Sequence, residues 1–288
     1  MARIQLIFAN YHCARQIADC VRPMLEHAHP VGIEVVIVNN GGEDFDATAL
    51  PSSSGVRLVS VTPGSNAGYF GALRTALKMT TRPGLHYRIL CNPDLEFDAR
   101  DFFARLAALT LPARCAVLAP SVVSTQTGRD QNPYLRQVPS VSLRRRWRWV
   151  YANRLNYQIN DWASALRAIL HARKDGESAS APAAGSAIHA PHGAMMIFTE
   201  AFLQCAPDFD RVPFLYAEEL FIGEICRRGR WTVWYEPTLK VLHREHATTG
   251  LLASSRRFAL QREAMRAYEL FASTPFDTTT LARRGSLE

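Results

Sequence analysis

The sequence predicts an α/β protein built around a mostly parallel, Rossmann-like sheet that is flanked by helices. Two observations predict this fold class. Strand and helix patterns alternate at short intervals through residues 1–120, as they do where crossover helices join parallel strands. Residues 34–39 (Glu-Val-Val-Ile-Val-Asn) form an almost continuous β-branched run, which is typical of a strand buried on both faces.

The individual elements follow from apolar spacing and from end signals. Strands are expected where short β-branched or apolar runs occur, at 4–9, 34–39, 56–61, 87–91, 116–119, 193–198, 231–235 and 239–243. Helices are expected where the apolar spacing is helical, at 14–27, 69–79, 99–109, 218–228 and 256–272. Pro23 is expected to kink or end the first helix, and Gly229 to end the fourth.

The chain is expected to form a single domain over residues 1–276, with a C-terminal helix. Its parts are a first regular half, a segment of different composition and a second regular half, at 1–120, 121–192 and 193–276. Residues 176–187 are low in complexity and are expected to form a mobile loop. Residues 277–288 are expected to be a tail, whose last four residues (Gly-Ser-Leu-Glu) look like a cloning scar.

The overall composition is that of a globular protein. The chain has 288 residues, 48% of them hydrophobic and 20% charged, and a net charge of +7, which argues against disorder, collagen-like repeats and coiled coils. The six cysteines are scattered without a CxxC pair, so we expect a reduced, cytoplasmic protein. The sequence contains neither an apolar run of about 18 residues nor a signal-peptide cleavage pattern.

The middle segment is unusually basic. Residues 131–160 contain six arginines and no acidic residue, with tryptophans and tyrosines interleaved. A solvated charged loop is the default interpretation. The alternative is a membrane-surface segment, in which the arginines of 144–154 hold the protein peripherally at an anionic membrane, such as the inner face of the bacterial plasma membrane.

Polar residues follow four of the expected strands, at 10–12, 39–42, 63–68 and 92–94. Turn geometry alone explains any one of these segments, because Asn, Gly, Pro and Asp favour turns. Ligands of open parallel sheets bind at the carboxyl ends of the strands. Four polar ends at one edge therefore favour a ligand site.

Three motifs carry side chains suited to catalysis. Asp94 follows a strand, where a carboxylate can hold Mg²⁺ or Mn²⁺, although Asn-Pro-Asp is also a good turn sequence. Glu218 and Glu219 begin an expected helix, where acidic residues also stabilise the helix dipole. His243 ends a strand, a position at which a lone histidine is often structural.

In this order the motifs resemble the family 2 glycosyltransferases with the GT-A fold, and within them the bacterial rhamnosyltransferase and capsule-type branch. The resemblance covers about residues 3–250. It rests on the order and spacing of short segments at 8–11, 36–44, 64–68, 90–94, 193–197, 214–228 and 241–246.

The resemblance implies transfer of a sugar from a nucleotide-diphosphate sugar to a hydroxyl, with inversion. Asp94 stands where the last Asp of a DxD-type motif binds Mg²⁺ or Mn²⁺, and His243 where a histidine completes metal or diphosphate binding. Adjacent helical residues diverge by about 100°, so only one of Glu218 and Glu219 can face the acceptor. We favour Glu219 as the catalytic base, since it stands where the family usually has Asp. The resemblance also implies that the donor is bound by Asn10, Tyr11, Asn39, Asn40, Gly41, Asn66, Gly68 and Asn92. On the acceptor side it implies Gly193, Ala194 and Tyr216.

The sequence departs from the family pattern at three positions. Asn39 stands where Asp is common, which leaves a dTDP-linked or a UDP-linked donor, with rhamnose among the candidate sugars. Asn92 replaces the first Asp of a full DxD motif, and Glu219 is one methylene longer than the usual Asp. No QxxRW motif follows, so a processive polymerase is not expected. The implied acceptor is a glycan or a lipid-linked oligosaccharide in cell-surface polysaccharide synthesis.

Other functions fit the sequence less well. A sugar-phosphate nucleotidyltransferase would have a Gly-rich, basic loop after the first strand, which residues 10–15 do not provide. A dinucleotide oxidoreductase needs GxGxxG, and the glycines of residues 64–71 have a different spacing. A nucleic-acid-binding protein would use the arginines and aromatics, but here the positive charge is confined to one insert.

Overall fold

The computed structural model describes residues 3–27, 29, 31–42, 44–79, 84–172, 185–245 and 254–275. The strands in these ranges are β1 (Arg3–Tyr11), β2 (Gly32–Gly41), β3 (Val56–Val61), β4 (Leu85–Cys91), β5 (Leu95–Glu96), β6 (Cys115–Ser124), β7 (Ser186–Ile188), β8 (Met195–Thr199) and β9 (Thr232–His243). The α-helices are α1 (Ala14–Leu25), α2 (Tyr69–Met79), α3 (Ala99–Ala108), α4 (Val141–Val150), α5 (Arg154–Ala172), α6 (Glu200–Gln204), α7 (Glu218–Arg228) and α8 (Ser254–Ser273).

The described strands form one sheet in the order β3-β2-β1-β4-β8-β6-β9-β5, with β7 paired to β9. The pairs β1–β2, β1–β4, β2–β3 and β6–β9 are parallel. Strand β8 lies antiparallel between β4 and β6, and β5 and β7 are antiparallel to β9. The predicted α/β class with a mostly parallel sheet is therefore confirmed.

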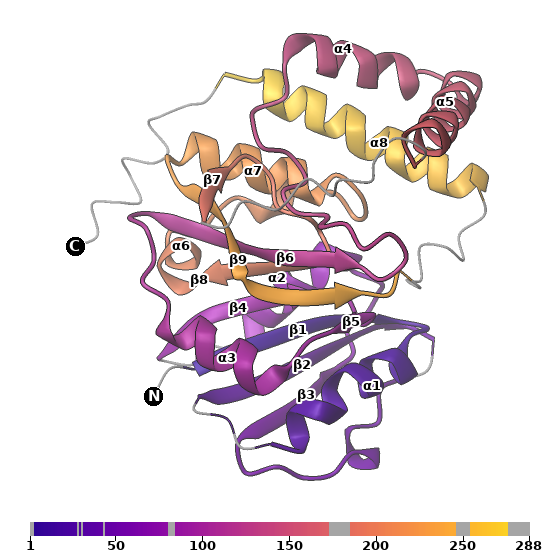
Figure 1. Cartoon of the computed structure of the whole chain (residues 1–288). Coiled ribbons are helices and arrows are strands. Elements are labelled where there is room, and N and C mark those ends of the chain that lie inside the picture. The colour runs from indigo at the N-terminus through magenta and orange to yellow at the C-terminus, as the bar shows by residue number, and fades with distance from the viewer. Residues whose placement is uncertain are drawn as a thin grey trace.

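Helices cover both faces of the sheet (Figure 1). One hydrophobic core joins the sheet to α1 and α3 through residues such as Ile17 and Phe103. The other core joins it to α2 and α7 through Phe70 and Phe221, and Tyr268 of α8 belongs to the same cluster. Helices α4 and α5 lie beyond α8, farthest from the sheet (Figure 1). In the described ranges, no helix combines the length and the apolar character needed to cross a membrane.

Residues 141–172 differ most from the expectation. The solvated loop predicted for residues 131–160 is wrong from residue 141 onward, because α4 and α5 form there, whereas residues 131–140 are not helical. The hydroxyl of Ser140 caps α4 by accepting a hydrogen bond from the Leu143 N–H at 3.2 Å. Most of the loop expected at 176–187 lies outside the described residues, and β7 begins at its C-terminal end.

The strands expected at 231–235 and 239–243 form a single strand, β9. The register against β6 shifts between them, since Pro120 pairs with Glu236 and Ser121 with Lys240. Pro237 lacks a backbone N–H, so it cannot donate to a regular ladder. The irregularity accommodates the proline while the pairing continues on both sides.

Candidate active site

A cavity of about 250 Å³ lies at the carboxyl ends of the parallel strands. Its walls come from the ends of β1 and β2, the loop before α2, the turn after β4, residues 192–194, and the starts of α7 and α8. Predicted residues that line it are Tyr11, Asn40, Asn66, Gly68, Asn92, Gly193, Ala194, Tyr216, Glu218 and Glu219. The structure thus brings most of the predicted donor, acceptor and catalytic positions to one place.

The loop before α2 is fixed from two sides. The side chain of Asn40 donates to the Gly68 carbonyl at 2.9 Å and accepts from the Ala67 N–H at 3.2 Å. Gly68 has a φ of +77°, and a Cβ there would overlap the backbone carbonyl of Phe214. That carbonyl accepts from the Tyr69 N–H at 3.3 Å. The donor-side loop therefore packs directly on the segment that leads into the acidic pair.

The acidic pair begins α7 after two residues in the left-handed region, Tyr216 (φ 71°) and Ala217 (φ 61°). Such conformations cost free energy and cluster at functional sites. Glu218 accepts a hydrogen bond from the Tyr216 N–H at 2.9 Å. Glu219 accepts one from the backbone N–H of Gly193, where a Cβ would collide with the Glu219 carboxylate. Each carboxylate is thus held by a different backbone group.

Burial raises the pKa of both glutamates, because the charged form loses its hydration. The charge of Glu219 adds to this effect and raises the pKa of Glu218 to about 8, although the backbone N–H groups act in the opposite direction. Two adjacent buried carboxyls of this kind retain a proton near neutral pH. The pair can therefore accept a proton from a hydroxyl close to physiological pH.

Asp94 and His243 lie side by side, as β5 pairs with the end of β9. His243 Nε2 is 3.4 Å from Asp94 Oδ1, and both side chains are buried. Gln131 orients the imidazole: its amide donates to Glu245 at 3.1 Å, so its oxygen accepts from His243 Nδ1 at 2.7 Å. Nε2 therefore faces a carboxylate oxygen, and in the neutral imidazole both of these atoms are acceptors.

Two such acceptors repel each other unless a proton or a cation lies between them. Both Asp94 oxygens and His243 Nε2 are buried without a hydrogen-bond partner among the described residues. A buried carboxylate and an imidazole nitrogen in this arrangement fit a divalent metal ion. No group of three or more His, Cys, Asp and Glu residues suited to a metal ion gathers in the described part of the chain.

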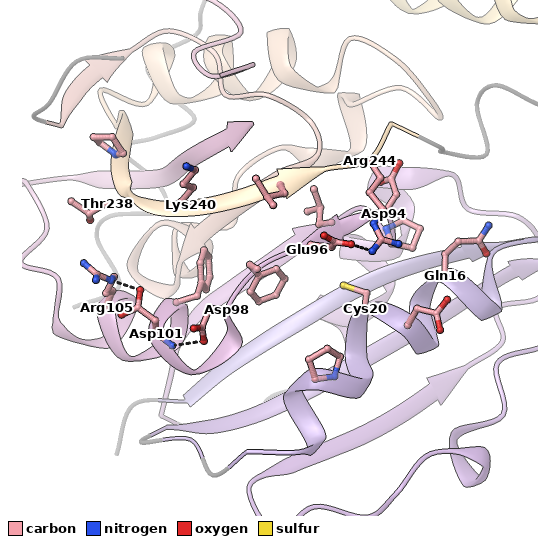
Figure 2. Close-up of a pocket in the computed structure, with 18 residues that line it drawn as sticks. Gln16, Cys20, Asp94, Glu96, Asp98, Asp101, Arg105, Thr238, Lys240 and Arg244 are labelled. Carbon is pink, nitrogen blue, oxygen red and sulfur yellow. Dashed lines mark hydrogen bonds and ion pairs between the residues drawn. The ribbon is translucent and has the colours of Figure 1, made fainter. Parts of the chain in front are cut away.

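Asp94 does not line the cavity of the acidic pair but a groove of about 920 Å³ next to it. Figure 2 shows Asp94 and Arg244 at one end of this groove and Asp101 and Arg105 at the other. Glu96, near Asp94, forms an ion pair with Arg244. Pro93 lines both hollows, which places Asp94 at the boundary between them.

Three predicted donor residues and His243 do not line the cavity. Asn39 is buried: its amide donates to Ser60 and Thr62, and its oxygen accepts from Asn10 and from the Phe45 N–H. Both amide hydrogens and both lone pairs of Asn39 are thus bound within the protein. Asn10 is also fully buried, and Gly41 has a φ of +134° next to the Tyr11 ring. His246, within a segment of the resemblance, lies outside the described residues.

Three lining residues with polar side chains, His192, Tyr69 and Arg256, were not predicted. His192 accepts from the Ala194 N–H through Nδ1 at 3.2 Å, and burial lowers its pKa to about 4, so it is neutral at pH 7. The Tyr69 hydroxyl donates to the Gly193 carbonyl at 2.8 Å, and Arg256 reaches the cavity from α8. None of them belongs to a segment of the resemblance, although Tyr69 and Arg256 are the first residues of the helices expected at 69–79 and 256–272.

Comparison with known proteins identifies the fold. No family model and no curated protein matches the sequence. The mannosyltransferase PcManGT from Pyrobaculum calidifontis, solved with GDP-Man and Mn²⁺, is 12% identical, with a TM-score of 0.49 over 99% of this chain and 79% of that chain. GalNAc-T7, solved with UDP, GalNAc and Mn²⁺, is 10% identical, with a TM-score of 0.54; the match covers 99% of this chain and about half (54%) of that chain. The fold is that of the GT-A glycosyltransferases.

Proposed function

We propose that the chain is an inverting glycosyltransferase that moves a sugar from a nucleotide-diphosphate sugar to a hydroxyl. The observation that carries this proposal is the acidic pair of buried Glu218 and half-buried Glu219, which lines a cavity at the carboxyl ends of parallel strands. Asp94 lies at the boundary of the same cavity. The GT-A fold and the UDP, GalNAc and Mn²⁺ of GalNAc-T7 support sugar transfer from a nucleotide sugar.

In the proposed reaction Glu219 accepts the proton of the acceptor hydroxyl. The hydroxyl oxygen then bonds to the anomeric carbon from the face opposite the diphosphate, and the bond from that carbon to the diphosphate oxygen breaks with its electron pair. The partly buried site suits this base, since a carboxylate with a raised pKa accepts a proton more readily. The Gly193 N–H holds the carboxylate in position.

Asp94 and His243 are the residues that would hold the metal ion, Mg²⁺ or Mn²⁺. When bound, the ion supplies positive charge against the diphosphate of the leaving group. Gln131 keeps the His243 Nε2 lone pair directed at Asp94, and so presents both side chains as ligands. The unpartnered buried oxygens of Asp94 support this assignment.

We assign the chain to family 2, in the rhamnosyltransferase and capsule-type branch, with a dTDP- or UDP-linked donor. The acceptor is a glycan or a lipid-linked oligosaccharide of cell-surface polysaccharide synthesis, reached from the cytoplasmic face of the membrane. Asn40, which fixes the loop carrying Asn66 and Gly68, supports a donor site at the ends of β2 and β3.

Ligand-dependent unfolding tests the proposal. UDP, dTDP and GDP, and their sugars, are added with and without Mn²⁺, and the unfolding midpoint is recorded. A ligand that binds only the folded state stabilises it by about 2.7 kcal/mol at 100 times its Kd. We expect one nucleotide class to raise the midpoint in a Mn²⁺-dependent way.

The matched variants separate the donor site from the metal site. Asp94→Ala should abolish the Mn²⁺-dependent part of the shift. Asp101→Ala, which removes an exposed carboxylate from the other end of the same groove, should preserve it. If no nucleotide shifts the midpoint, the transferase proposal is wrong; if Asp94→Ala keeps the full shift, only the metal assignment is wrong.

A further inference from the structure

The α4–α5 hairpin forms the outermost layer of the molecule, beyond α8 (Figure 1). Its inner side is fixed by specific contacts. Arg144 forms a bidentate ion pair with Glu269 of α8, at 3.0 and 3.1 Å. The rings of Trp147 and Tyr157 contact Tyr268 and Phe258 of the same helix. Because these contacts orient both helices, the residues on the opposite side face away from the protein.

The outward side of α5 carries an apolar stripe. Leu155, Ile159 and Trp162 are spaced four and three residues apart, so they share one face of the helix. Their exposed fractions are 64%, 45% and 78%. Trp149 of α4 is 49% exposed as well. Large side chains on one contiguous face, exposed to this degree, indicate a surface that binds something.

The hairpin also carries exposed arginines. They are Arg145, Arg146, Arg148 and Arg154. Arg146 and Arg154 donate hydrogen bonds to the neutral side chains of Asn160 and Ser254. The guanidinium of Arg148 is 4.0 Å from Glu269, which Arg144 already binds more closely. These four arginines form a basic rim, which outnumbers Asp161, the exposed acidic residue that precedes Trp162.

We propose that the hairpin docks on an anionic membrane surface, with Leu155, Ile159 and Trp162 entering the interface and the arginines contacting lipid headgroups. An amphipathic helix with a basic rim and an outward tryptophan binds bilayers in this way. A nucleic acid would pair with the arginines but gives no reason for an aliphatic stripe. Arg144, predicted from the sequence to contact the membrane, instead holds α4 on α8.

The hairpin also stands next to the cavity. Arg154 of α5 donates to the Ser254 hydroxyl at 3.1 Å, and the Tyr157 ring of α5 contacts Phe258. Ser254 and Phe258 lie in the first turns of α8. Arg256 and Leu260, from the same turns of α8, line the cavity. Docking of the hairpin would thus bring the cavity close to the lipid surface. The functional value of this placement rests on the proposed transfer to a lipid-linked acceptor, whereas the docking itself does not.

Vesicle co-sedimentation of the full chain tests the apolar stripe. Vesicles of phosphatidylcholine mixed with phosphatidylglycerol should bind the parent protein. The double variant Ile159→Ser, Trp162→Ser should bind about tenfold more weakly or worse, because the inserted apolar surface is lost. The control Met79→Ser, Leu270→Ser removes exposed apolar side chains elsewhere and should bind like the parent.

A second pair of variants tests the rim. Arg145→Ser, Arg148→Ser should weaken binding roughly 30-fold, since each arginine near an anionic surface contributes about fivefold. Arg15→Ser, Arg22→Ser removes the same charge from exposed positions of α1 and should have little effect. Pure phosphatidylcholine vesicles and high salt should both weaken binding of the parent.

Circular dichroism confirms that each variant is folded before its binding is compared. Equal sedimentation of the parent, the stripe variant and the rim variant would overturn the proposal. So would light scattering that shows a dimer abolished by Trp162→Ser without any vesicle binding, since the stripe would then contact a second copy. The assay contains no donor and no metal, so its result does not depend on the proposed reaction.

Discussion

The cavity at the sheet edge and the α4–α5 hairpin are both rich in charged and aromatic residues, but the structure holds them in opposite ways. In the cavity, Glu218 is buried and Glu219 half-buried, and each accepts a hydrogen bond from a backbone N–H. On the hairpin, Arg145 and Trp162 are exposed. Charges in the cavity are fixed in position, whereas those on the hairpin keep their hydration and freedom.

This difference separates two kinds of function. A buried charge costs desolvation free energy, so it persists where its position or its altered pKa is useful. An exposed arginine costs little and acts through the summed field of its neighbours. Changes in the cavity should therefore have large effects at single residues. Single substitutions on the hairpin should change stability little, except at a residue such as Arg144 that holds the hairpin on α8.

The largest effect is expected at the catalytic base. Glu219→Gln keeps the shape of the side chain and removes its basicity, so turnover should fall by roughly 10²–10⁴. Donor affinity, measured by the unfolding midpoint, should persist. Glu218→Gln is the control and should retain much more activity. If Glu218→Gln abolishes turnover and Glu219→Gln does not, Glu218 is the base.

Gly68→Ala should be the next largest perturbation. The new Cβ would overlap the Phe214 carbonyl, and alanine disfavours the φ of +77°. Together these should lower the free energy of unfolding by about 2 kcal/mol or more. Gly128→Ala is the matched control: its φ is +69° with open space around it, so only the backbone strain remains, about 1 kcal/mol. Denaturant unfolding measures both, and equal losses would contradict the packing argument.

The raised pKa values of the acidic pair predict opposite pH trends for activity and stability. The base must be ionised, so turnover should rise about tenfold per pH unit below the raised pKa. The folded state binds more protons than the unfolded state between the ordinary and the raised pKa. The stability that this provides is therefore present in acid and is lost as pH rises toward 8.

Glu218→Gln sharpens this pH test. Without the Glu218 charge beside it, Glu219 should ionise at lower pH, so the rising limb of the turnover profile should move toward acid. Unfolding free energy should also fall less steeply with pH in this variant. Profiles identical to those of the parent would show that the two carboxyls do not share a proton.

The smallest effect distinguishes two neighbouring arginines on α4. Arg144→Ala removes the bidentate, half-buried ion pair with Glu269, which should cost about 1 kcal/mol of unfolding free energy. Arg145→Ala changes an exposed residue and should stay within about 0.5 kcal/mol of the parent. Similar losses for both would mean that Glu269 does not anchor the hairpin. Chemical denaturation is sufficient to measure the difference.

The sheet was predictable because its strands are short apolar runs between turn residues. The run at 34–39, for example, lies inside β2 and is buried throughout. The hairpin was not predictable in the same way. In α4 and α5 the inward and outward sides both carry aromatics, and arginines lie between them, so the apolar residues do not show the one-sided spacing of a helix. Antiparallel insertion of β8 depends on pairing between distant segments, which no local pattern records.

The site was predictable only where the sequence marks a strand end or a helix start. Asp94, Asn40 and Glu219 are such positions, and they border or line the cavity. The bonding of Asn39 was not readable, because its four partners come from other strands and loops. His192 was missed since its position depends on how the chain after residue 184 returns to the sheet.

The insertion of β8 between β4 and β6 has a consequence for synthesis on the ribosome. Strand β4 can pair with β1 early, but its other edge waits for Met195–Thr199, which is made much later. At roughly 5–20 residues per second, that edge stays open for several seconds or longer. Because β4 ends in the apolar run Ile89–Cys91, the nascent chain presents a template on which other chains can aggregate. Successful folding in the cell therefore depends on protection of this edge until the second half of the chain arrives.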